Sequence, residues 1–262
     1  AEKALRDGVI KTQADRGSAI VLHSKTGAIL AMANYPGFDP NRYQKFSRAL
    51  QLNRAATAGY EPGSTFKMIT IAAALNEGEI SPEQKFFCEN GKYKIGNNLV
   101  RDTSSHGIMT LKQILKKSSN ICAAKIGMSM TPAKFHEYIK RFGFGQRPNS
   151  GVAAEASGRV ISPKYWQMID HANISFGQAI LVSPLQMVSA ANVFANGGDW
   201  VPPYIIDHLR DKNGKILNEI RDNNGNIIQN FGKGARSTVI EASVARLVKE
   251  YLISVTQKGG TA

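Results

Sequence analysis

The segment that most constrains how this chain can fold is Glu61–Lys67, which reads E-P-G-S-T-F-K. A proline-glycine pair interrupts regular structure, and the apolar run behind it predicts a helix over residues 66–75. Residues three apart on a helix are neighbours, with Cβ atoms roughly 5–6 Å apart. We therefore expect Lys67 to reach the hydroxyl of Ser64. A serine hydroxyl needs a base at this distance to become a nucleophile, and the N–H groups at a helix start can stabilise an oxyanion.

An isolated S-x-x-K pair is more often a helix cap and a solvated lysine than a catalytic pair. The second motif, Ser118-Ser119-Asn120, lies between an apolar-periodic run and a helix-like segment. On its own it would be a loop or capping triplet. Downstream of an S-x-x-K, an S-x-N triplet is the second element of a serine acyltransferase signature. The candidate catalytic residues are therefore Ser64, Lys67, Ser118 and Asn120.

These motifs give the chain a specific resemblance. It resembles the transpeptidase domain of a class B penicillin-binding protein, and is more similar to the septal (cell-division or sporulation) type than to the elongation type. Further matches follow in the order of the family: residues 26–33 and 35–41, residues 90–93 with Asp102, residues 114–120, and residues 175–178 with 183–186 and 195–198.

The resemblance implies one α/β transpeptidase domain over residues 1–262, incomplete at its C-terminus. An antiparallel β-sheet flanked by helices would lie beside a largely helical subdomain, roughly residues 68–175, and the C-terminal strands would be missing. Residues 204–230 stand apart as an exposed insertion. Because Asn213-Gly214 and Asn224-Gly225 each separate strand-like residues, we expect antiparallel hairpins there.

Other elements follow from the apolar patterns. Residues 1–15 predict an amphipathic helix. Residues 19–22 and 29–33 predict two strands of a hairpin, and their nearly continuous apolar character indicates strands covered on both faces. Residues 88–107 are expected to be irregular, and Ser183-Pro184 is typical of a helix start.

By resemblance, the activity is peptidoglycan D,D-transpeptidation. Ser64 would attack the D-alanyl-D-alanine end of a stem peptide, with Lys67 as its base. Ser118 would pass the proton to the leaving amine, and Asn120 would hydrogen-bond the acyl chain. The implied partners are stem peptides, β-lactam antibiotics and, in the full-length protein, divisome or other cell-wall synthesis proteins. The implied location is the bacterial cell envelope, as the periplasmic domain of a single-pass inner-membrane protein whose anchor lies outside this chain.

The third motif of the family, K-T-G on a strand, is not evident. Lys258-Gly259-Gly260-Thr261 follows an amphipathic helix over residues 244–255, where glycines are typical of a helix C-cap. We therefore expect the chain to stop before this motif, with Lys258 in a degenerate K-T-G as the alternative. The missing strand would remove an oxyanion donor worth about 10²–10³ in kcat, so we expect this chain alone to be acylated by β-lactams poorly or not at all.

Composition excludes several other function classes. The net charge of +13 favours anionic partners, but the basic residues are scattered without aromatic interleaving, so we expect no nucleic acid. His136-Glu137 is not followed by a histidine at position 140, and we expect neither metal nor cofactor. Cys88 and Cys122 lack C-x-x-C spacing, which favours two separate thiols over a disulfide.

Two alternatives share the first motif. A class D-like serine β-lactamase would typically carry S-x-V in place of S-x-N, and a class A enzyme would need an E-x-x-L-N loop that this chain does not have. A β-lactam-binding sensor domain would react once and retain the ester.

Overall fold

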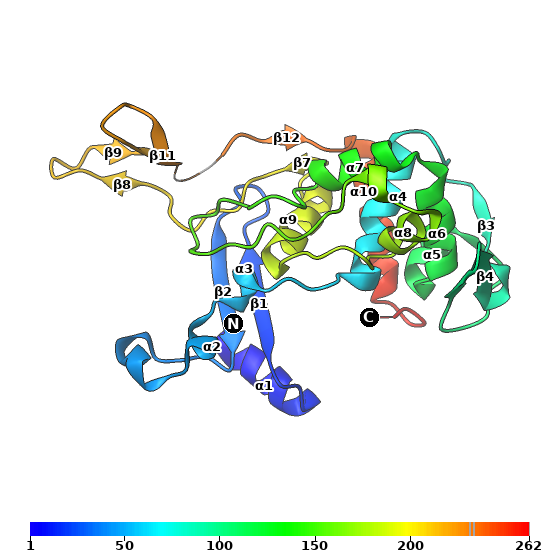
Figure 1. The fold of residues 1–262 in the computed structure, drawn as a ribbon, viewed down its shortest axis with the longest axis horizontal. Coiled ribbons are helices and arrows are strands. Elements are labelled where there is room, and N and C mark those ends of the chain that lie inside the picture. The colour runs from blue at the N-terminus through cyan, green and yellow to red at the C-terminus, as the bar shows by residue number, and fades with distance from the viewer. Residues whose placement is uncertain (231, 233, 262) are drawn as a thin grey trace.

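The fold is a helical body attached to an extended β-rich part, as seen in a computed structural model that describes residues 1–230, 232 and 234–261 (Figure 1). Helix α4 (Lys67–Asn76) runs through the centre of the helical body. Every residue from Lys67 to Leu75 is buried, as expected for a helix that is apolar nearly all round. The helices of the body that surround it are α5 (Leu111–Lys117), α6 (Asn120–Ser129), α7 (Pro132–Arg141), α8 (Met168–Ser175), α9 (Pro184–Ala195) and α10 (Ala242–Val255).

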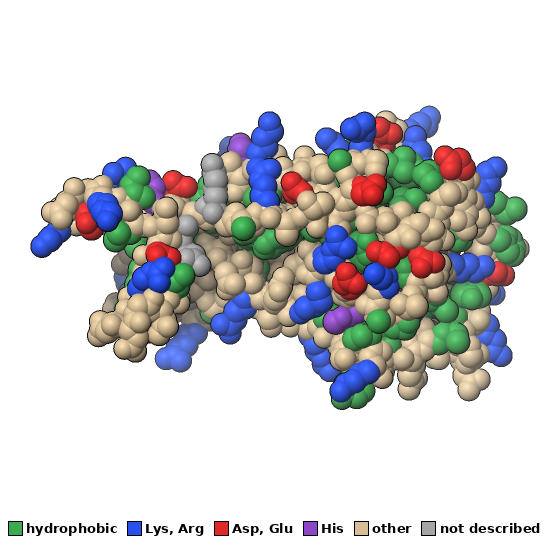
Figure 2. All heavy atoms as spheres, turned by 90° about the horizontal axis from the view of Figure 1, so that it is seen from above, with side chains coloured by type: hydrophobic (Ala, Val, Ile, Leu, Met, Phe, Trp, Pro, Cys, Tyr) green, Lys and Arg blue, Asp and Glu red, His purple; other side chains and the backbone are tan. Residues whose placement is uncertain are grey.

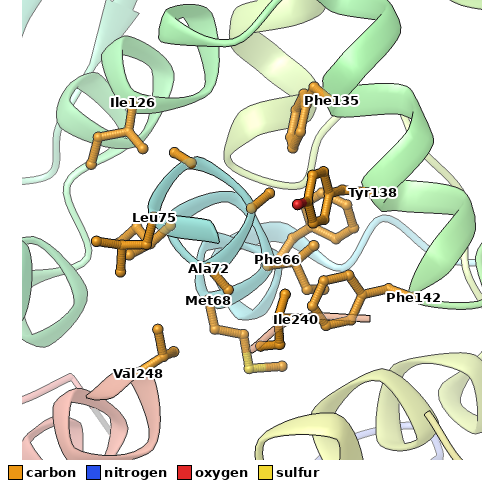
Figure 3. Packing of buried hydrophobic residues seen from close by; sticks show 14 of the residues in the cluster. Phe66, Met68, Ala72, Leu75, Ile126, Phe135, Tyr138, Phe142, Ile240 and Val248 are labelled. Atoms are coloured by element: carbon orange, nitrogen blue, oxygen red, sulfur yellow. The ribbon is translucent and has the colours of Figure 1, made fainter. Parts of the chain in front are cut away.

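Side chains of several other helices pack around α4. Figure 3 shows Ala72 and Leu75 of α4 with Val248 of α10 on one side of the helix and Tyr138 of α7 on another, all within one buried cluster. The predicted helix over residues 66–75 is confirmed, but its first turn is a 3₁₀ helix, η2 (Gly63–Phe66), that continues directly into α4. This central helix fixes the position of any group on its first turn.

The predicted N-terminal hairpin is confirmed. Strand β1 (Gly17–Leu22) pairs antiparallel with β2 (Ile29–Tyr35), and α1 (Glu2–Thr12) and α9 pack against the pair. The prediction that both faces are covered was wrong, because the side chains of Val21 and Leu30 are 48% and 63% exposed. A continuous apolar run does not by itself reveal which face a neighbouring helix covers.

Residues 88–107 were expected to be irregular, and this was wrong. Within this range β4 (Lys92–Ile95) pairs antiparallel with β5 (Asn98–Arg101), and immediately outside it β3 (Lys85–Phe87) pairs antiparallel with β6 (Ile108–Thr110). Each strand has three or four residues, too few to show an alternating pattern in the sequence.

The expectation of two separate thiols was also wrong. Cys88 and Cys122 form a disulfide whose Cα atoms lie 5.2 Å apart. The β3–β6 pairing brings Cys88 onto the first turns of α6, a proximity that a separation of 34 residues in sequence does not reveal. The bond joins the segment between β3 and β4 to α6.

The insertion forms the two hairpins that its Asn-Gly turns predict, and it extends away from the body (Figure 1). In each turn an aspartate accepts two backbone N–H groups: Asp211 from residues 213 and 215, and Asp222 from residues 224 and 226. The strands are β8 (Leu209–Arg210), β9 (Ile216–Leu217), β10 (Glu219–Arg221) and β11 (Ile227–Asn230).

The remaining elements are short. The predicted start of α9 at Ser183-Pro184 is confirmed, with Ser183 and Gln186 forming a reciprocal capping box. The others are η1 (Pro40–Lys45), α2 (Arg48–Gln51), α3 (Arg54–Thr57), η3 (Glu89–Gly91), η4 (Pro163–Tyr165), β7 (Asp199–Trp200) and β12 (Ser237–Thr238). Among the helices of the described residues, none combines the length and apolar character needed to cross a bilayer.

Candidate active site

Ser64 and Lys67 meet at the start of the central helix. The ammonium Nζ of Lys67 donates a hydrogen bond to Ser64 Oγ at 3.1 Å. Ser64 belongs to the 3₁₀ turn, in which side chains three residues apart eclipse one another, so the side chains of Ser64 and Lys67 lie on the same side of the turn. Only 1% of Lys67 is exposed.

The second motif supplies the other partners of Lys67. Nζ also donates to Ser118 Oγ at 2.9 Å and to the Ser118 carbonyl oxygen at 2.6 Å. Ser118 ends α5 in the left-handed conformation, with φ of 58°, and this turn directs both of its oxygens to the lysine. An ammonium has three donors, and here each has an acceptor.

The surroundings of Lys67 favour its neutral form. Burial lowers the pKa of Lys67 from 10.5 to about 8, while the negative charge of Asp102 acts in the opposite direction. At pH 7 roughly a tenth of the molecules then carry the neutral amine, compared with far fewer than one in a hundred for an exposed lysine. The neutral amine can accept the proton of Ser64 as the hydroxyl attacks.

The start of the central helix also provides a donor for an oxyanion. Ser64 is the second residue of η2, so its backbone N–H precedes the hydrogen bonds of the helix. The loop after α8 approaches closely here: Gly63 N–H donates to the Gly177 carbonyl at 2.9 Å. Gly177 has φ of +82°, and a Cβ there would lie 2.1 Å from the Gly63 carbonyl oxygen, so only glycine fits.

Asn120 is the first residue of α6 and borders a small cavity. Its amide Nδ2 donates to the carbonyl of Arg101 at 3.0 Å. The cavity has a volume of about 320 Å³ and lies between β5, the start of α6 and the end of α8. Larger hollows of about 620 and 530 Å³ lie beside residues 147–155 and beside α1, and none of the four candidate residues lines them.

Sequence reasoning missed one group in this region, Asp102. The sequence gives it no role beyond the resemblance, but its carboxylate accepts hydrogen bonds from Ser119 Oγ and from the N–H groups of Asn120 and Ile121. These partners lie 17 to 19 residues away in the sequence, so no local spacing identifies the contact.

The segment that could be mistaken for a third motif lies in a turn. Helix α10 ends at Val255, and Lys258 follows in the loop rather than on a strand. Lys117 Nζ donates to the Gly259 carbonyl at 3.0 Å, which holds this loop near the end of α5. The position of Lys258 opposes its assignment to a K-T-G strand.

The described residues contain no group of three or more His, Cys, Asp or Glu side chains arranged to hold a metal ion. Lysine and arginine side chains are scattered over the face seen in Figure 2, without a continuous basic stripe.

Comparison with known proteins adds independent information. Residues 17–262 match the family model described as penicillin binding protein transpeptidase domain. A probable peptidoglycan D,D-transpeptidase PenA from Neisseria flavescens is 33% identical over 257 residues, which are 98% of this chain and 58% of that protein. The peptidoglycan D,D-transpeptidase FtsI of Escherichia coli is 32% identical over 198 residues, which are 76% of this chain and 33% of that protein. The chain thus spans between one third and three fifths of the length of these relatives.

A solved structure shares the fold. Penicillin-binding protein 3 of Mycobacterium tuberculosis, in complex with aztreonam, matches with a TM-score of 0.86 and 28% identity, covering 98% of this chain and 55% of that one.

Proposed function

The chain belongs to the penicillin-binding protein transpeptidase family, and we propose that the protein carrying it is a peptidoglycan D,D-transpeptidase that acts through an acyl-enzyme on Ser64. The single observation that supports this most strongly is the hydrogen-bonded arrangement of Ser64, Lys67 and Ser118 around a buried ammonium. Two relatives named as D,D-transpeptidases agree with it.

In the proposed first step, Ser64 Oγ attacks the penultimate carbonyl of a D-alanyl-D-alanine stem peptide. The neutral amine of Lys67 takes the hydroxyl proton, and the Ser64 N–H donates to the oxyanion. The C–N bond then breaks, and the leaving amine receives a proton from Ser118 Oγ, which regains one from Lys67. Free D-alanine departs and an ester on Ser64 remains.

In the second step, an amine of a neighbouring stem peptide attacks the ester. Lys67 accepts a proton from the attacking amine and passes it to Ser64 Oγ as the C–O bond breaks. Asn120, at the rim of the cavity beside α6, would hydrogen-bond the acyl chain and hold it across both steps.

A β-lactam is a mimic of this substrate, so covalent labelling tests the proposal. The product of the complete gene, incubated with a fluorescent penicillin, should gain one adduct, and mass spectrometry should place it on the peptide that contains Ser64. The Ser64→Ala protein should stay unlabelled while its unfolding temperature changes little. An adduct that persists in Ser64→Ala would contradict the proposal.

The fate of the adduct separates the alternatives. A transpeptidase keeps the β-lactam ester for many minutes and, with a stem peptide and an acceptor amine, forms a cross-linked product. Release of hydrolysed antibiotic within seconds would instead indicate a serine β-lactamase. A stable ester without any cross-linked product would indicate a β-lactam-binding sensor.

We further propose that the protein acts in septal cell-wall synthesis, in the bacterial cell envelope, with divisome proteins as partners. The similarity to FtsI supports this assignment. Septal enrichment of a fluorescent fusion would agree with it, and uniform labelling of the lateral wall would argue for an elongation role.

A further inference from the structure

A carboxylate outside the four candidate residues holds the second motif in place. We propose that Asp102 is a positioning residue, whose carboxylate fixes the turn that presents Ser118 and Asn120 to Lys67 and Ser64. This inference rests on the proposed function, because it concerns the same reaction.

The first argument is the number of contacts that Asp102 makes with the motif. Oδ2 accepts the hydroxyl of Ser119 at 2.6 Å, and Oδ1 accepts the N–H groups of Asn120 at 2.6 Å and Ile121 at 3.0 Å. The two N–H groups lie in the first turn of α6, where no helical carbonyl is available to them. A carboxylate at this end of a helix forms strong, charge-assisted hydrogen bonds and also meets the positive end of the helix dipole.

The second argument is that the contact reaches the core of the motif. Ser119 is completely buried, and its Oγ also accepts the N–H of Cys122 at 3.0 Å. Ser119 therefore links Asp102 to α6 on one side, while its chain neighbour Ser118 contacts Lys67 on the other. A shift of Asp102 would be transmitted to both residues next to Ser119.

The third argument is that the segment carrying Asp102 is itself fixed. Its backbone N–H donates to the Gly91 carbonyl, and the neighbouring carbonyl of Arg101 accepts the Asn120 amide. The disulfide ties the segment between β3 and β4, which includes Gly91, to α6 at a second point. The side chain thus joins two rigid parts of the fold at the site.

The charge of Asp102 also acts on the catalytic lysine. Among the described residues, Asp102 is the charged group that raises the pKa of Lys67 against the effect of burial. Charged side chains on the adjoining segments have other partners: Glu61 accepts the N–H of Ala179, and Lys117 binds the loop after α10. Removing the Asp102 charge should therefore lower the pKa of Lys67 further.

The test measures the rate of Ser64 acylation by a fluorescent penicillin as a function of pH, in the complete gene product. Asp102→Asn keeps the shape of the side chain but loses its charge, whereas Asp102→Ala removes all three contacts. We expect Asp102→Ala to lower the plateau rate about 100-fold, the loss that a displaced catalytic group can cause. In Asp102→Asn the rising limb of the profile should move to lower pH by roughly one unit.

Asp170→Asn is the matched control, since that carboxylate also accepts a backbone N–H, at the start of α8. Its acylation rate and pH profile should match those of the wild type.

The fraction of protein that becomes labelled reports how much is folded, and the rate reports the site. A fall in the labelled fraction with an unchanged rate and pH profile would reduce Asp102 to a stability role and overturn the inference. Normal rates and profiles in both variants would overturn it as well. If Asp102→Ala does not fold, the pH profile of Asp102→Asn decides. Absence of labelling in the wild type would refute the proposed function itself, and this inference with it.

Discussion

A buried lysine should make the native protein less stable than a chain with an apolar side chain in its place. Lys67 has a pKa of about 8 in the folded state and an ordinary value of 10.5. The lowered pKa means that the folded state disfavours the charged form. Lys67→Met replaces the ammonium by an apolar group of similar length. The variant should no longer be acylated, and removing the cost of burying the charge should raise its free energy of unfolding.

The magnitude follows from the difference in pKa. Each unit corresponds to about 1.4 kcal/mol, so the charged lysine destabilises the fold by about 3 kcal/mol at pH 7. Because the folded-state pKa is the lower one, the unfolded chain binds more protons between pH 8 and 10.5, and stability rises with pH across this window. By pH 9.5 about 2 kcal/mol of the penalty should have disappeared.

The substitution also leaves the Ser118 carbonyl without its donor, which costs about 1–3 kcal/mol. This loss is the same at both pH values. It therefore cancels in a double difference: the free energy of unfolding of Lys67→Met minus that of the wild type, taken at pH 7, less the same quantity at pH 9.5. Urea unfolding of both proteins at the two pH values gives this double difference directly. We expect about 2 kcal/mol, with the advantage of Lys67→Met shrinking as pH rises.

Lys112 provides the matched control, because it lies exposed on α5. Lys112→Met should show the same difference from wild type at pH 7 and at pH 9.5. If the double difference for Lys67→Met is also near zero, the lysine is not held in a lowered-pKa state. The argument for Lys67 as the base of Ser64 would then be refuted.

Three further outcomes are expected. The acylation rate should rise with pH as Lys67 loses its proton and level off above about pH 8; a rate independent of pH from 6 to 9 would exclude this lysine as the base. Reduction of the Cys88–Cys122 disulfide, or replacement of both cysteines by serine, should lower the free energy of unfolding by about 2–4 kcal/mol, and urea unfolding that is unchanged would show that the bond contributes nothing. Gly177→Ala should slow acylation, because its Cβ would displace Gly63 beside the nucleophile; wild-type kinetics in this variant would show that the loop moves freely.

The sequence predicted the parts of the site that depend on local geometry. Ser64 and Lys67 lie three residues apart at one helix start, so their contact requires no tertiary structure. The placement of Ser118 against Lys67 was expected only from the resemblance, because the contact spans 51 residues. The domain boundaries and the catalytic roles of the four residues remain predictions.

The features that sequence reasoning missed all depend on short strands or long-range contacts. The β3–β6 and β4–β5 pairs are too short to show a period, yet they bring Cys88 and Asp102 to α6. Neither residue has a neighbour in sequence that indicates its partner. An aspartate followed by loop residues usually caps its own turn, as Asp211 and Asp222 do, whereas Asp102 caps a helix that begins 18 residues later.

The position of the lysine explains why so much structure converges on this site. A charged ammonium in a buried position is tolerated only while its acceptors stay in place, since a buried charge without hydrogen-bond partners is costly. The Ser64 acceptor is fixed by the 3₁₀ turn, and the Ser118 acceptors by the left-handed end of α5. Ser64 belongs to the central helix of the core. The position of Ser118 depends instead on the turn before α6, which Asp102 and the disulfide hold to the segments beside the short strands. Loosening that connection while the Asp102 charge is kept, as by breaking the disulfide, would give the amine room to become hydrated, which would raise the pKa of Lys67 and reduce the fraction of neutral amine. A rigid second motif and a lysine that can be neutral at the first motif are therefore one physical requirement.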